Sequence, residues 1–258
     1  MLLENVKQAV TNRTKVISLA YVTNTIGDVR PLKEIIKFAH ENNIIVVVDA
    51  AQAAPHMKID VKDLDCDFLA FSAHKCYGPT GLGVLYGRRD VLRNTMAVRF
   101  GGGMNETFDS EDLIALKSLP YTLEAGTQAI SEVIAFAESI KYINQIGMEK
   151  IHEEEVRLKK LLVSKLQNFS HIKVYNPDTA SGLVTFNVDG VFPQDVAYYL
   201  NKYHVCVRAG NHCAKLTKFV LDTANTVRIS LAFYNTEEEV LKVAELLSDK
   251  NRIIEEMI

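Results

Sequence analysis

The chain has 258 residues, of which 48% are hydrophobic and 24% charged, a composition that excludes disordered and collagen-like proteins. Its 29 basic and 32 acidic side chains give a formal net charge of −3, which argues against nucleic acid or an anionic membrane as a partner. No apolar run reaches the roughly 18 residues of a membrane span, and the N-terminal residues do not resemble a secretory signal. The four cysteines include no C-x-x-C pair, so we expect no disulfide framework, no metal and a reducing cytoplasm.

The first half of the chain alternates short apolar runs with one helical pattern. Pro31 opens that helix, and apolar residues then recur every three or four positions. The five aliphatic residues 44–48 predict a strand buried on both faces, ended by Asp49. The order strand, helix, strand predicts a mostly parallel α/β sheet. We expect its strands at 15–21, 44–48, 68–71 and 83–86.

The second half differs in its pattern, because it opens with a long helix-periodic stretch. Residues 130–169 are helix-periodic with a break at Gly147, and Thr236 with Glu239 forms a capping-box pattern. A smaller α+β domain is therefore expected, with domains over 1–140 and 141–258. Its strands are expected at 183–188, 204–207 and 227–231, and its helices at 193–203 and from 237 onward.

Polar side chains follow two of the predicted strands. Asp49 and Gln52 come after one strand, and Ser72, His74 and Lys75 after another, before a glycine-rich loop. Pyridoxal 5′-phosphate requires three things of a protein: an acid for its pyridinium nitrogen, an amine for a Schiff base, and hydrogen-bond donors for its phosphate. Each feature alone is more often a helix cap, a surface charge or a turn, so the hypothesis depends on their joint occurrence.

Longer motifs around these residues resemble one family. The chain is similar to the group II (SufS-type) cysteine desulfurases, which are aminotransferase class V, fold type I enzymes that use pyridoxal phosphate. The resemblance implies part of the large cofactor-binding domain followed by the small domain. The matching stretches run in order along the chain: 48–56, 65–68, 72–83, 100–103, 123–127, 207–214 and 227–236.

The resemblance implies a role for each matching residue. Lys75 binds the cofactor covalently and shuttles protons, His74 and Ser72 bind its phosphate, and Cys213 is the nucleophile. Asp49 pairs with the pyridine nitrogen, beside Asn24 and Gln52. In a homodimer, Thr127 reaches the phosphate of the other subunit. Arg228 holds the substrate carboxylate, and Arg208 lies beside the entrance.

The implied reaction converts L-cysteine to L-alanine and leaves a persulfide on Cys213, whose sulfur passes to an acceptor protein for iron–sulfur cluster assembly. Cys213 stands among polar residues, as a reactive loop thiol does, whereas Cys206 is interpreted as core. Cys66 and Cys76 are interpreted as structural. His56 is expected on the surface or in a loop, and His212 is close enough in sequence to assist the thiol.

The match departs from the family in two places. Asn211 stands where the family usually has the first of two histidines before the nucleophile. Family members also extend before the position of Met1, in a part that supplies half of the large sheet, a phosphate loop and a histidine that stacks on the cofactor. We therefore expect a truncated or split enzyme with little activity unless an N-terminal chain complements it.

Several alternatives stay open. Selenocysteine lyase uses the same scaffold, with L-selenocysteine as substrate. A kynureninase-like hydrolase of the same class would not need Cys213. An inactive fragment or scaffold could dock the acceptor protein without binding a cofactor.

Overall fold

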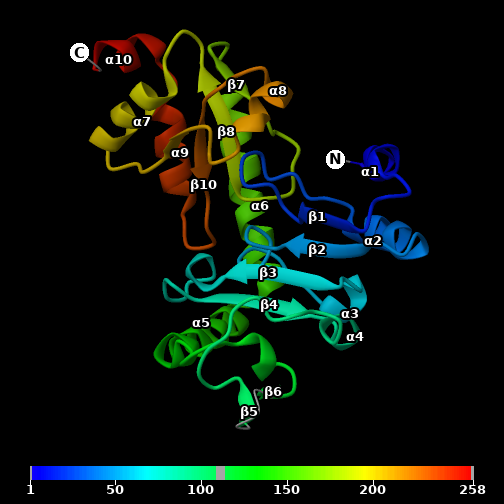
Figure 1. The fold of residues 1–258 in the computed structure, drawn as a ribbon. Helices are drawn as coiled ribbons and strands as arrows, with labels where there is room; N and C mark the ends of the chain where they lie inside the picture. The colour runs from blue at the N-terminus through cyan, green and yellow to red at the C-terminus, as the bar shows by residue number, and fades with distance from the viewer. Residues whose placement is uncertain (1, 109–113, 257–258) are drawn as a thin grey trace.

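The computed structural model describes residues 2–108 and 114–256, which form two four-stranded sheets and a two-stranded sheet (Figure 1). The first sheet comes from the N-terminal part and the second from the C-terminal part, and helix α6 (Met148–Leu166) contributes to both cores. Within the described residues, no helix combines the length and the apolar character needed to cross a bilayer.

The first sheet has the order β1-β2-β3-β4. The first three strands run parallel, as the sequence predicts, so their carboxyl ends meet at one edge. The fourth strand returns antiparallel, because the loop that precedes it is too short for a crossover helix. The strands are β1 (Val16–Ala20), β2 (Ile45–Asp49), β3 (Phe68–Ser72) and β4 (Gly83–Gly87).

Helices cover this sheet unevenly. The apolar face of α2 packs on β1 and β2, which buries Val46 and Val48 completely. Ile45, which points to the opposite face, is 37% exposed, so the expectation that β2 is covered on both faces is wrong. Helix α5 reaches β3 on the same face as Val48, because Leu69 pairs with Val48 and Phe71, which packs on Phe136, lies two residues further along the strand. The helices are α1 (Leu3–Ala9), α2 (Leu32–Glu41), α3 (Val61–Leu64), α4 (Arg89–Leu92) and α5 (Ile130–Ile146).

Besides α4, three further elements lie between β4 and α5. Strands β5 (Asn105–Phe108) and β6 (Ile114–Leu116) pair antiparallel, and a single 3₁₀ turn, η2 (Tyr121–Leu123), follows. Gly147 then separates α5 from α6 with a φ of 95°, which confirms the predicted break. Residue 141 falls within α5, and the division into 1–140 and 141–258 stays a prediction.

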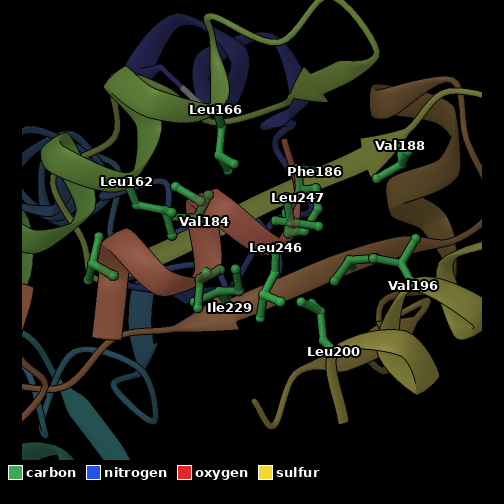
Figure 2. Packing of buried hydrophobic residues seen from close by; sticks show 14 of the residues in the cluster. Leu162, Leu166, Val184, Phe186, Val188, Val196, Leu200, Ile229, Leu246 and Leu247 are labelled. Atoms are coloured by element: carbon green, nitrogen blue, oxygen red, sulfur yellow. The ribbon is translucent and has the colours of Figure 1, made fainter. Parts of the chain in front are cut away.

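The second sheet has the order β7-β8-β10-β9 and is antiparallel throughout. Figure 2 shows its core, where Val184 and Phe186 of β8 meet Leu162 and Leu166 of α6 and Leu246 of α9. The predicted capping box of Thr236 is present at the start of α9. The elements are β7 (Ile172–Val174), β8 (Leu183–Val188), β9 (Arg208–Gly210), β10 (Thr226–Ser230), α7 (Pro193–Lys202), α8 (Lys218–Leu221), α9 (Glu237–Leu246) and α10 (Lys250–Glu255).

The strand expected at 204–207 is wrong, because the chain enters strand conformation only at β9. A tight turn ends α7 there: His204 has a φ of 61°, and the N–H of Val205 donates to the Leu200 carbonyl at 3.1 Å. Cys206, in the segment after this turn, is exposed, so its assignment to the core is also wrong. Cys66 and Cys76 are buried, as expected.

Helix α6 buries two charged side chains, Glu155 and Lys159. Glu155 is fully buried, and both its carboxylate oxygens lie 3.0 Å from Nδ1 of His56, which is half-buried in the loop after β2, as expected of a surface or loop histidine. Lys159 is 1% exposed and donates from Nζ to the Thr179 carbonyl at 2.6 Å and to its hydroxyl at 2.5 Å. These two hydrogen bonds offset part of the cost of burying the amine.

The buried amine predicts a pH-dependent stability. Burial lowers the pKa of Lys159 from 10.5 to about 8, and Asp178 opposes this only in part. Between these pH values the unfolded chain binds more protons than the folded chain, so the folded state gains stability as pH rises, by about 3 kcal/mol. Lys159→Met should lack this gain when free energies of unfolding in urea are compared near pH 8 and near pH 10.5.

The control for this measurement is Lys160→Met, which removes an exposed lysine at the next position of α6. It should keep the pH dependence of the wild type. A parallel pH response in wild type and Lys159→Met would contradict the account.

Candidate functional site

A cavity of about 800 Å³ lies at the carboxyl ends of β1 and β2. Its walls include the loop after β1, the end of β2 with the turn that follows, and the 3₁₀ turn η1 (Ala73–Lys75). Residues between 213 and 220, in the segment that joins β9 to β10, form a further wall. Ligands commonly sit at this edge of open parallel sheets. The cavity is therefore the place where the candidate residues of both halves of the chain can meet.

Five of the predicted site residues line this one cavity: Asn24, Asp49, Gln52, Lys75 and Cys213. They come from four separate segments, and 189 positions of sequence separate the first from the last. The remaining five lie outside its lining as the structure describes it. Ser72 is half-buried at the end of β3, and His74 and Thr127 are exposed. Arg208 contacts Cys213, and Arg228 contacts Asn24.

Asp49 is exposed at the end of β2, although the strand that it ends is aliphatic. The residue lines the cavity, and its Oδ1 accepts a hydrogen bond from the N–H of Ala51 at 2.9 Å. Arg30 lines the same wall and was missed by the sequence reasoning. Its Nη1 donates to the Ala20 carbonyl at 3.2 Å, while its buried Nε has no partner in the described residues. Burial lowers the pKa of Arg30, and the nearby carboxylates of Asp28 and Asp49 oppose that shift.

The turn η1 and the loop after it hold Lys75. The N–H of Ala73 donates to Leu82 at 3.0 Å, and the N–H groups of Cys76 and Gly78 donate back to Ala73. A Cβ on Gly78 would lie 2.5 Å from the ring of Phe136 and 2.9 Å from the Ala73 carbonyl. The loop thus needs glycine at this position to pack beneath α5, and it fixes the backbone that carries Lys75.

Cys213 is exposed on a turn of unusual backbone conformation. His212 and Cys213 have φ values of 51° and 61°, in the left-handed region that ordinary residues rarely adopt. Asn211 Oδ1 accepts from the N–H of Cys213 at 3.1 Å and so closes the turn. Nη2 of Arg208 lies 3.0 Å from the Cys213 sulfur, in position to stabilise a thiolate.

His212 turns away from its neighbouring thiol. The ring is buried, and its Nε2 lies 2.8 Å from the hydroxyl of Thr226 on β10. Burial first, and then the charges of Arg228 and Arg208, lower the pKa of His212 to about 4. The expectation that His212 assists Cys213 is therefore not supported by the ring's position, whereas its carbonyl accepts from Asn24 Nδ2 at 2.6 Å.

Arg228 of β10 reaches toward the first sheet. Its Nη1 donates to the carbonyl of Asn24 at 2.6 Å, and its buried Nε has no hydrogen-bond partner in the described residues. Burial and the neighbouring charge of Arg208 lower its pKa, and Cys213 opposes them. A guanidinium held in this way has unused donors for an anionic ligand.

Two motifs far from the cavity lie together. The N–H of Gly126 donates to the carbonyl of Gly102 at 2.8 Å, so the 100–103 and 123–127 stretches are neighbours. Thr127 follows on this loop before α5. In the part of the chain that is described, no cluster of three or more His, Cys, Asp or Glu side chains is arranged to hold a metal ion.

Comparisons with known proteins agree with this architecture. A probable cysteine desulfurase of Halalkalibacterium halodurans is 40% identical over 243 residues, which are 94% of this chain and 60% of that relative. The crystal structure of the cysteine desulfurase CsdA from Escherichia coli, in its S-sulfonic acid form, superposes with a TM-score of 0.92 at 30% identity and covers 99% of this chain and 63% of that one. The apo cysteine desulfurase of Thermococcus onnurineus NA1 gives 0.91 at 36% identity over 95% of this chain and 62% of that one.

This chain spans about 60% of the length of the curated relatives that it matches. The fold is that of the fold type I enzymes, with a parallel sheet at the cavity and a second, antiparallel sheet beside it. The model of the aminotransferase class-V family matches residues 1–243. The chain therefore belongs to the aminotransferase class-V family.

Proposed function

We propose that this chain acts as a cysteine desulfurase that depends on pyridoxal 5′-phosphate. The observation that carries the proposal is that Lys75, Asp49 and Cys213 line one cavity, together with Asn24 and Gln52. An amine, a carboxylate and an accessible thiol in one site are the groups that this reaction requires. The desulfurase relatives named above support the same function.

The cavity fits the cofactor in size and in chemistry. Its volume of about 800 Å³ lies within the range of small-molecule sites. Lys75 would hold pyridoxal phosphate covalently, Asp49 would face its ring nitrogen, and Asn24 and Gln52 would lie near its phenolic oxygen. Ser72 and His74 would bind its phosphate from beside the cavity. When bound, the cofactor supplies an electron sink that weakens the bond between Cβ and Sγ of the substrate.

The chain's own residues would perform the other parts of the reaction. Arg228 binds the substrate carboxylate through its free donors, and Lys75 takes and returns the proton on the substrate α-carbon. The Cys213 thiolate, stabilised by Arg208, attacks the substrate sulfur. L-Cysteine and the Cys213 thiol thus become L-alanine and a Cys213 persulfide, without an external oxidant or reductant.

The setting of the reaction belongs to the same proposal. The persulfide sulfur would pass to an acceptor protein for iron–sulfur cluster assembly. A homodimer would bring Thr127 to the partner's phosphate, and the exposed apolar residues Ile130, Val133 and Ile134 of α5 support such a contact. All four cysteines are free thiols, which supports a reducing cytoplasm. Selenocysteine remains an alternative substrate, because the same residues would bind it.

A second candidate function is a scaffold that docks the acceptor protein without binding a cofactor. Leu216, Phe219 and Val220 are each at least 75% exposed and follow directly on Cys213. Apolar side chains gathered in this way are typical of a protein contact. The colour of the protein separates the two functions, because only the desulfurase binds pyridoxal phosphate.

Lys75→Ala tests the covalent linkage. Wild-type protein mixed with pyridoxal phosphate should become yellow and keep its visible absorption band after gel filtration. The band should vanish in Lys75→Ala, because no other amine lies on the cavity lining described. Lys62→Ala, which removes an exposed lysine of α3, should keep the band. A colourless wild type would favour the scaffold.

The role of the thiol is tested by Cys213→Ser in a single turnover with L-cysteine. Sulfur transfer should fall by at least about a thousandfold, the scale on which loss of a nucleophile acts. Cys206→Ser is the matched control, since Cys206 is the other exposed thiol and does not line the cavity. Mass spectrometry should find one added sulfur on Cys213 in wild type and in Cys206→Ser. Alanine production from L-cysteine that survives Cys213→Ser would contradict the role of Cys213 as the sulfur acceptor.

A further inference from the structure

Three successive backbone carbonyls in the loop after β1 each accept hydrogen bonds from the second sheet or the turn before β8. We call residues 23–28 the Asn24 loop; its own bonds join Thr23 N–H to the Asp28 carbonyl and Gly27 N–H to the Thr23 carbonyl, both at 3.0 Å. Figure 1 shows this loop, in blue, beside the yellow-green strand β8. The carbonyl of Asn24 accepts from Arg228, that of Thr25 from the Thr185 hydroxyl, and that of Ile26 from Asn176 and Thr179.

The donors are fixed before they meet the loop. Thr185 is fully buried on β8, and Asn176 is 2% exposed. The Asn176 side chain accepts from Thr185 N–H and donates to the Leu183 carbonyl, both at 2.8 Å, besides its 2.8 Å bond to Ile26. A buried amide with all these bonds made has one orientation only. The position of the loop is therefore dictated by the second sheet.

The backbone approaches very closely at one position. Gly27 has a φ of 64°, and a Cβ there would lie 1.8 Å from the Ser181 hydroxyl. Only glycine permits this approach. The contact between loop and sheet thus involves hydrogen bonds and close packing together.

This contact bears directly on the cavity. Asn24 lines the cavity, its side chain donates to the His212 carbonyl next to Cys213, and its own carbonyl fixes one nitrogen of Arg228. A small displacement of the loop would therefore change the position of Arg228 and of the turn that carries Cys213.

We propose that Thr185 and Asn176 are positioning residues for the site, which hold the Asn24 loop so that Arg228 presents its free donors to the substrate carboxylate. Neither residue lines the cavity, so both would act through the Thr25 and Ile26 carbonyls. This inference rests on the proposed desulfurase function.

The test is Thr185→Val, which keeps the shape of the side chain and removes its hydroxyl donor. The KM for L-cysteine should rise about tenfold, the scale of one lost buried hydrogen bond, while kcat changes less than about twofold. Thr185→Ser restores the hydroxyl and should restore the wild-type KM. Thr223→Val is the matched control, because the Thr223 hydroxyl donates only to its near neighbour Asn225 and not to the Asn24 loop.

Hydrogen exchange supplies a readout that does not depend on activity. The amide protons of Gly27 and Asp28, which are bonded within the loop, should exchange faster in Thr185→Val than in wild type and in Thr223→Val. If Thr185→Val does not fold, Thr179→Val removes a half-buried donor to Ile26 and should give the same two results; it is made in the Lys159→Met background, because the Thr179 hydroxyl also accepts from Lys159.

The outcomes separate the two proposals. If wild type turns over L-cysteine and Thr185→Val keeps the wild-type KM, the positioning role is overturned and the desulfurase function stands. Unchanged exchange at Gly27 and Asp28 also overturns the positioning role. If wild type binds no pyridoxal phosphate and forms no persulfide, the desulfurase function fails, and the positioning role fails with it.

Discussion

The site depends on how the polar backbone of one loop is satisfied where two sheets meet. The backbone carbonyls of residues 24–26 take no part in the hydrogen bonds between strands of the first sheet. A buried carbonyl without a hydrogen-bond donor would lower the stability of the folded state. Donors on the second sheet and the turn before β8 supply the missing bonds. These hydrogen bonds set the distance between the strand end that carries Asp49 and the turn that carries Cys213.

Elementary sheet geometry explains the other half of the site. Parallel strands end at the same edge, so the residues that follow β1, β2 and β3 are neighbours although they are far apart in sequence. Asp49 ends one strand, and Lys75 lies in the turn after the next. The cavity between them is wide, and the carboxylate of Asp49 is solvated rather than buried. A bound ring would have to exclude that water to strengthen the interaction with Asp49.

The sequence was a good guide to features that depend on local pattern. Gly147, the Thr236 capping box and the strand at 183–188 were all predictable, because propensity and periodicity act over a few residues. Five cavity residues were also found from the sequence, since the family motifs and the sheet rule point to the same edge.

Features that depend on tertiary contacts were not predictable. In the sequence, Glu155 and Lys159 look like part of a solvated face of α6. Their burial is tolerated because Glu155 contacts His56 and Lys159 donates to Thr179, and both partners lie outside the helix. The ring of His212 could not be placed from its neighbours in sequence, because the left-handed turn at His212 and Cys213 redirects it toward Thr226. Arg30 was missed since a single arginine in a loop carries no pattern.

The central claim is that Lys75, among all lysines of the chain, lies where pyridoxal phosphate binds. The most direct measurement is to incubate the protein with pyridoxal phosphate, reduce it with borohydride and map the modified peptides by mass spectrometry. The account predicts one reduced pyridoxyl group, on Lys75. Modification spread over exposed lysines such as Lys58 and Lys62, with none preferred at Lys75, would contradict it.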